Sequence, residues 1–163
     1  MSIKIYFDMD GTVYDFYSQT NWLDRLINED VSVYKEGGLL FNIVEFNNVV
    51  RNLISRGVEF GVITWASKGS SDEFFRETET AKRQWCKEYL PFCTSFVVQE
   101  YGTPKQYGIS KRTKKDILID DNIEVLKMWD NFGTRRGFQI TKYKDVTRIL
   151  RDIELKLILN QEI

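Results

Sequence analysis

The stretch IYFDMDGTVYD, residues 5–15, decides the fold of this chain. Its first three residues complete a nearly continuous apolar run that starts at residue 3, and such a run is typical of a buried β-strand. Asp8 and Asp10 follow the run directly, and Gly11 allows the sharp turn by which the chain leaves the strand. Two carboxylates in such a turn can be aimed at one point above the end of the strand.

Four further segments rich in β-branched and apolar residues follow, at 58–63, 95–99, 116–119 and 137–140. Between the segments lie helical patterns at 39–56, 72–89, 122–131 and 144–159. Strands that alternate with helices predict a doubly wound, mainly parallel sheet with helices on both faces. We therefore expect an α/β, Rossmann-like three-layer sandwich with a five-stranded sheet.

The 163 residues suit a single domain, 1–163, because the sequence contains no repeat, low-complexity tract or linker. Residues 14–38 are more than a turn from strand to helix needs. Within them Trp22, Leu23, Leu26 and Ile27 lie at helical spacing. This insert after the first strand is expected to form a small helical cap beside the site.

The composition excludes several kinds of chemistry. With no histidine, the chain cannot build a Ser-His-Asp triad, a Cys-His pair or a histidine-ligated zinc site. Cys86 and Cys93 form neither a disulfide framework nor a metal-ligand spacing, which favours a reduced cytoplasm. No apolar run approaches the roughly 20 residues of a membrane span, and the net charge of -1 does not call for nucleic acid. We expect a cytoplasmic protein without a membrane partner.

Carboxylates gather where two of the predicted strands end. Asp8 and Asp10 follow the first strand, and Asp120 and Asp121 end the fourth. In open α/β sheets, ligands bind at the carboxyl ends of the strands, so these four side chains should share one site. Their mutual repulsion predicts a hard cation with oxygen ligands, and Mg²⁺ fits because it binds one or two carboxylates together with a substrate phosphate.

The order of these residues resembles the haloacid dehalogenase (HAD) superfamily of phosphatases. Residues 5–15 look like its first motif, FGVIT at 60–64 its second, Lys105 in GTPKQYG its third and DILIDDN at 116–122 its fourth. The resemblance covers residues 3–127. Within the superfamily, AKRQW at 81–85 together with GTPK and LIDDN is similar to the 5'(3')-deoxyribonucleotidase-like branch, which includes bacterial and phage nucleotidases.

The resemblance implies a magnesium-dependent phosphomonoesterase that forms an aspartyl phosphate. It makes Asp8 the nucleophile and Asp10 the general acid and base. It implies that Asp8, the backbone carbonyl of Asp10 and Asp121 hold the metal. Asp120 would be either a second ligand acting through water or an orienting residue.

The resemblance also implies the groups that hold the phosphate oxygens: the Thr64 hydroxyl, the Lys105 ammonium, and backbone amides near Met9 and Trp65. Lys105 is favoured because Pro104 fixes a loop just past the third strand. The other candidates for the phosphate lysine are the remaining lysines of this region: Lys111, Lys114 and Lys115.

The substrate is expected to be a small phosphorylated molecule, in the first place a (deoxy)nucleoside monophosphate. The aromatic residues that could stack on a base, or else pack in the cap and core, are Tyr14, Phe16, Tyr17, Trp22 and Trp65. The basic run at 111–115 is either a solvated loop or a polyanion site. Alternative functions are a 3'-phosphatase of nucleic-acid ends and a catalytically silent HAD-fold binding protein; the oligomeric state stays open.

Overall fold

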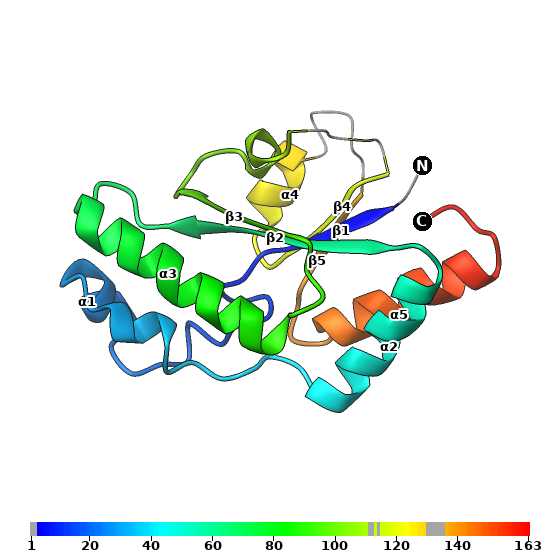
Figure 1. Ribbon diagram of the computed structural model, residues 1–163, viewed down its shortest axis with the longest axis horizontal. Coiled ribbons are helices and arrows are strands. Elements are labelled where there is room, and N and C mark those ends of the chain that lie inside the picture. The colour runs from blue at the N-terminus through cyan, green and yellow to red at the C-terminus, as the bar shows by residue number, and fades with distance from the viewer. Residues whose placement is uncertain (1–2, 111–112, 114, 130–135) are drawn as a thin grey trace.

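The computed structural model describes residues 3–110, 113, 115–129 and 136–163, and its centre is one parallel sheet (Figure 1). The strands lie in the order β3-β2-β1-β4-β5, and each neighbouring pair runs parallel. Their bounds are β1 Lys4–Phe7, β2 Glu59–Ala66, β3 Ser95–Glu100, β4 Ile117–Asp120 and β5 Gly137–Gln139. The predicted doubly wound, five-stranded parallel sheet is therefore confirmed.

The helices occupy the segments between the strands. Among the described residues the α-helices are α1 Trp22–Ile27, α2 Ile43–Ser55, α3 Asp72–Tyr89, α4 Ile123–Trp129 and α5 Val146–Ile158. Ser71 caps the start of α3, because its hydroxyl accepts a hydrogen bond from the Phe74 N–H at 3.1 Å. In this described part of the chain, each helix is too short or too polar to cross a membrane.

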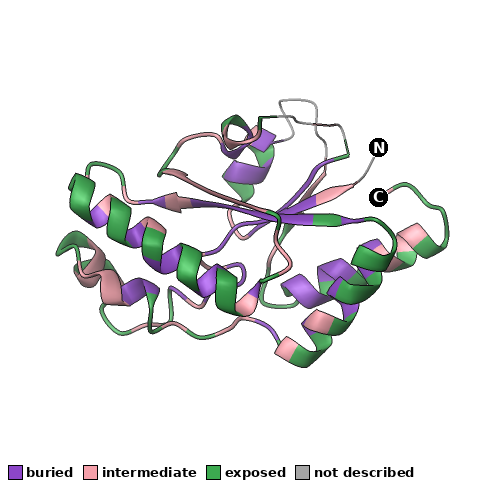
Figure 2. Cartoon of the chain, viewed as in Figure 1, coloured by how far each residue is buried: buried purple, intermediate pink, exposed green. Residues whose placement is uncertain are grey.

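Both faces of the sheet are covered, because alternate residues of β1 point to opposite sides. Ile5 and Phe7 belong to the larger core, which includes residues of α2, α3 and α5. Tyr6 points the other way and packs edge-on against Trp129 of α4, with ring centroids 6.1 Å apart. Figure 1 shows α4 on one side of the sheet and α2, α3 and α5 on the other, and Figure 2 shows buried strands between helices with exposed outer surfaces. The three layers match the prediction.

One predicted helix begins later than the sequence pattern indicated. Residues 39–42 are not helical, and α2 begins at Ile43, because the Asn42 side chain accepts hydrogen bonds from two N–H groups of the first turn. The apolar residues at helical spacing in this segment predicted its buried face: Leu40, Val44, Val50, Leu53 and Ile54. Val50 and Leu53 are buried as predicted, together with Phe46 and Val49, but Val44 and Ile54 are 66% and 43% exposed. The pattern therefore predicted that a helix is present, but it was wrong about where the helix begins and about part of its buried face.

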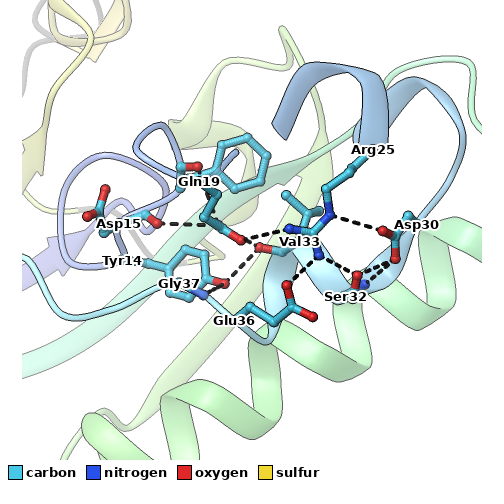
Figure 3. A network of polar contacts seen from close by, with 10 residues as sticks. Tyr14, Asp15, Gln19, Arg25, Asp30, Ser32, Val33, Glu36 and Gly37 are labelled. Carbon is cyan, nitrogen blue, oxygen red and sulfur yellow. Dashed lines mark hydrogen bonds and ion pairs between the residues drawn. The ribbon is translucent and has the colours of Figure 1, made fainter. Parts of the chain in front are cut away.

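The insert between β1 and α2 contains α1 and a short 3₁₀ helix, η1 (Val31–Tyr34). Within this insert, the Arg25 guanidinium pairs with Asp30 at 3.0 Å and with Glu36 at 2.7 Å (Figure 3). The Tyr14 hydroxyl donates to the Val33 carbonyl at 2.7 Å and so ties the insert to the chain that leaves β1. These contacts satisfy polar groups in a segment that has little hydrophobic core of its own. Its role as a cap stays a prediction.

Candidate active site

The site lies at the topological switch point of the sheet. The chain winds from β1 through β2 to β3 on one side and continues from β4 to β5 on the other, so β1 and β4 flank the switch. Phe7 and Ile119 are register partners across these strands, which brings Asp8 level with Asp120. A crevice at the carboxyl ends of such strands is the usual binding place in this architecture.

Most of the predicted site residues line one cavity of about 220 Å³. The predicted ones among its lining are Asp8, Asp10, Trp65, Lys105, Asp120 and Asp121. Gly11 allows the walls to approach closely: its φ is 79°, and a side chain there would meet an Asp121 oxygen at 2.6 Å. The structure therefore brings together carboxylates that are more than a hundred residues apart in the chain.

Lys105 is the cation at the base of this cavity. It is buried at the start of the 3₁₀ helix η2 (Lys105–Gly108), and its ammonium contacts Asp8 Oδ1 and, at 2.6 Å, Asp120 Oδ2. Burial alone would lower the pKa of Lys105, but the two carboxylates outweigh burial and raise it. Lys115 is exposed, and Lys111 and Lys114 lie outside the described residues. The ammonium that the structure places beside Asp8 is thus that of Lys105.

Asp120 and Asp121 occupy different environments. Asp120 is held at both oxygens, by Lys105 and by the Asn122 N–H at 2.9 Å. Asp121 is partly exposed, and each of Asp8, Asp120 and Asp121 offers an oxygen within 4.8 Å of the other two. Burial and the charge of Asp8 raise the pKa of Asp121 to about 7. An oxygen cluster of this kind matches the donor set that Mg²⁺ prefers, with Asp121 the freer ligand and Asp120 suited to orienting Lys105.

Asp10 has a partner of its own. Its Oδ2 accepts from the Lys82 ammonium at 2.5 Å, while its Oδ1 has no hydrogen-bond partner among the described residues. Burial raises the pKa of Asp10, although Lys82 acts in the opposite direction. The predicted contribution of its backbone carbonyl to a metal site stays a prediction. Two lysines therefore pair with the two aspartates that follow β1: Lys105 with Asp8 and Lys82 with Asp10.

The two residues predicted at the end of β2 differ in access. Thr64 is fully buried, and its hydroxyl accepts from Lys82 at 2.9 Å. Trp65 lines the cavity, and its indole N–H donates to the Thr103 carbonyl at 2.8 Å. Its ring centroid lies 5.2 Å from the Lys105 ammonium. The roles of Thr64 and Trp65 toward phosphate stay predictions.

Aromatic rings form much of the remaining wall. Phe16, Tyr17 and Trp22 come from the insert and contact one another, with centroids 5.2–5.4 Å apart. The other aromatic lining residues are Tyr34, Trp65 and Tyr101. Tyr14 was the fifth candidate for stacking, but it is buried and packs edge-on against Trp85. Of the two alternatives, Tyr14 therefore takes the packing role.

Sequence reasoning gave no role to three residues of this region: Lys82, Ser67 and Tyr101. Ser67 and Tyr101 line the cavity just past the ends of β2 and β3. Lys82 had a detectable signal, because it lies four residues from both Thr78 and Cys86 on the buried stripe of α3. A lysine on an apolar stripe needs buried acceptors, and here the strand ends supply them.

Fold and site together define a Rossmann-like α/β protein with an acidic cavity at the switch point of its sheet. A solved structure with this fold is the crystal structure of D,D-heptose 1,7-bisphosphate phosphatase from Burkholderia thailandensis, with a TM-score of 0.53. It is 10% identical to this chain, and the alignment covers 93% of this chain and 98% of that one. No model of a known protein family matches the chain, and no curated protein matches it in sequence. At this identity the likeness shows the fold alone.

Proposed function

We propose that this protein is a magnesium-dependent phosphomonoesterase that works through an aspartyl phosphate on Asp8. The observation that carries the proposal is the surroundings of Asp8. Its carboxylate lies in the cavity at the switch point, paired with the Lys105 ammonium and within reach of the Asp120 and Asp121 oxygens. A nucleophile, a fixed cation and a set of metal ligands are the parts that phosphoryl transfer needs.

The proposed reaction has two steps. An Asp8 oxygen attacks phosphorus, the bond from phosphorus to the ester oxygen breaks, and Asp10 gives its proton to the departing alkoxide. Asp10 then takes a proton from a water molecule as that water attacks the aspartyl phosphate, which releases phosphate and restores Asp8. Lys105 stays charged throughout and offsets the negative charge of the phosphoryl oxygens.

The metal in this proposal is Mg²⁺, held by Asp8 and Asp121, with the Asp10 carbonyl as a further ligand. Bound there, it would neutralise and orient the phosphoryl group. The donor set fits, because three carboxylates face one another with one lysine ammonium among them. Without a cation, such a cluster repels itself.

Removal of one carboxylate tests the metal site through protein stability. Because the folded-state pKa of Asp121 is raised from 3.8 to about 7, the folded protein holds this proton more tightly than the unfolded chain does. The free energy of unfolding therefore falls as pH rises from about 4 to about 7. Asp121→Asn should make the metal-free protein about 1–2 kcal/mol more stable at pH 8, after allowance for solvent screening.

Thermal unfolding with and without MgCl₂ measures this effect. Mg²⁺ should raise the Tm of the wild type more at pH 8 than at pH 5.5, since the metal binds ionised carboxylates. Asp121→Asn should lose this increase, whereas Asp152→Asn on the exposed face of α5 should keep it. An equal Mg²⁺ effect in wild type and Asp121→Asn would rule out Asp121 as a ligand.

We infer that the substrate is a small phosphoester with a flat ring, in the first place a (deoxy)nucleoside monophosphate. Asp8 is buried and lines a cavity of about 220 Å³, a size that suits a small molecule better than the end of a nucleic acid. The aromatic wall offers stacking surfaces above the carboxylates. Phosphatase assays over nucleotides, sugar phosphates and 3'-phosphorylated oligonucleotides, with and without Mg²⁺, test the proposal. Inertness toward all of these substrates would favour a silent binding protein.

Trp22→Ala tests the aromatic wall separately from the chemistry. Stacking of a base on an aromatic ring contributes about 1–3 kcal/mol, so KM for a nucleoside monophosphate should rise about 5- to 100-fold. Ribose 5-phosphate lacks the base, and its KM should change little. Leu23→Ala is the matched control, because Leu23 is the next residue of α1 and is 51% exposed. If both substrates lost affinity equally, the wall would not bind a base.

A further inference from the structure

Lys82 is a buried cation that the proposed reaction does not yet use. It lies in the middle of α3 with no exposed surface, between Phe74 and Trp85 on the side that faces the sheet. A buried ammonium is costly unless acceptors surround it. Burial of Lys82 in α3, 72 residues from Asp10 in the chain, therefore requires contacts that compensate for the lost hydration of its ammonium.

All three N–H groups of the ammonium have an acceptor. They donate to Asp10 Oδ2 at 2.5 Å, to Thr64 Oγ1 at 2.9 Å and to the Trp65 carbonyl at 2.6 Å. An ammonium has three donors, so this set is complete. Two of the acceptors belong to β2, which is a rigid strand buried in the sheet. Lys82 thus links the Asp10 side chain to strand β2 of the central sheet.

The consequence for Asp10 is a fixed orientation. With Oδ2 held by Lys82, the carboxyl group cannot rotate freely, and its buried Oδ1 lacks a partner among the described residues. The Asp10 side chain as a whole is 18% exposed and lines the cavity. Because Lys82 itself is fully buried, it cannot contact a substrate in the cavity. Any effect that it has on catalysis must therefore pass through the groups that it contacts, which are Asp10, Thr64, the Trp65 carbonyl and the Tyr34 ring.

We propose that Lys82 is a positioning residue that holds the Asp10 carboxyl, at the wall of the cavity, in the orientation in which it exchanges protons with the leaving group and with the attacking water. This inference rests on the proposed phosphomonoesterase function. In the first step, the Asp10 proton passes to the ester oxygen as its bond to phosphorus breaks. In the second step, the Asp10 carboxylate receives a proton from water. The hydrogen bond from Lys82 to Asp10 is kept in both steps.

The dependence of the rate on the leaving group separates this role from a structural one. Proton donation speeds the loss of a poor leaving group such as an alkoxide far more than that of a nitrophenolate. In Lys82→Met, kcat/KM for benzyl phosphate should fall about 100-fold, but kcat/KM for p-nitrophenyl phosphate by less than about 10-fold. Both values come from one preparation, so the fraction of folded protein cancels from their ratio.

Asp10→Asn should change the same ratio in the same direction. In the double variant, Lys82→Met should add nothing further to the ratio, because the group that Lys82 positions is gone. Lys87→Met, at an exposed position of the same helix, should leave the ratio at its wild-type value.

Three results would overturn the inference. Equal losses on both substrates in Lys82→Met would reduce Lys82 to a structural role while leaving the proposed function intact. A further change of the ratio in the double variant would show that Lys82 does not act through Asp10. Wild-type inertness toward both esters would overturn the phosphomonoesterase proposal itself, and the positioning role with it.

Discussion

Asp8→Asn should abolish phosphomonoester hydrolysis, with a fall in kcat of at least about 10⁴-fold. An amide oxygen is a poor nucleophile, so the bond between Asp8 and phosphorus cannot form. The variant should still fold, because Lys105 keeps its contact with Asp120 at 2.6 Å. The loss should therefore be one of chemistry and not of structure.

The measurement combines steady-state kinetics with trapping of the intermediate. Wild-type protein quenched in acid during turnover should carry one extra phosphoryl group, and the peptide that contains Asp8 should hold it. Asp8→Asn should carry none. Asp152→Asn removes an aspartate from a surface ion pair on α5 and should retain full activity. Hydrolysis by Asp8→Asn at a rate near that of the wild type would remove the covalent mechanism.

The fold was predictable because its determinants are local and periodic. The apolar runs of the strands and the helical pattern of α3 with its Ser71 cap each follow from neighbouring residues. The position of the site followed as well, because parallel strands bring their carboxyl ends to one edge. Asp8 and Asp120 could thus be placed in one site without knowledge of any contact between them.

What the sequence could not supply were contacts made by single side chains across the fold. Lys82 and Asp10 meet because α3 packs against β2 beside the residues that follow β1, and no local pattern encodes that packing. The start of α2 was missed for a different reason. There, the Asn42 cap overrode an apolar spacing that included Val44, which the structure leaves exposed. Helix capping and tertiary contacts determine where a helix begins and which side chains meet, and neither is visible in the periodicity of apolar residues.

The second large effect is expected from Lys105→Met, which removes the positive charge from a nearly dry part of the site. Asp8 and Asp120 would then face each other without the ammonium that now contacts both. Loss of one partner from a buried ion pair costs about 3–5 kcal/mol, because the remaining charge is uncompensated. We expect a fall in Tm of the order of 10 °C at pH 7 and a loss of about 10²- to 10³-fold in kcat.

The pH dependence of this loss identifies its cause. Burial and the charge of Asp8 raise the pKa of Asp120 to about 6 even though Lys105 acts in the opposite direction. Without Lys105, the ionised form of Asp120 destabilises the folded state, so the difference in Tm between variant and wild type should shrink as the pH falls below about 6. A difference that stayed constant from pH 8 to pH 4 would point to lost packing of the lysine stem instead.

A second variant separates repulsion from packing at constant pH. Lys105→Met combined with Asp120→Asn leaves one buried carboxylate in place of two, so the double variant should regain part of the lost stability. Lys127→Met is the matched control, because Lys127 pairs with Glu124 on the exposed side of α4 and should change stability by less than about 0.5 kcal/mol. If Asp120→Asn gave no recovery, repulsion between Asp8 and Asp120 could not be the reason that the site needs Lys105.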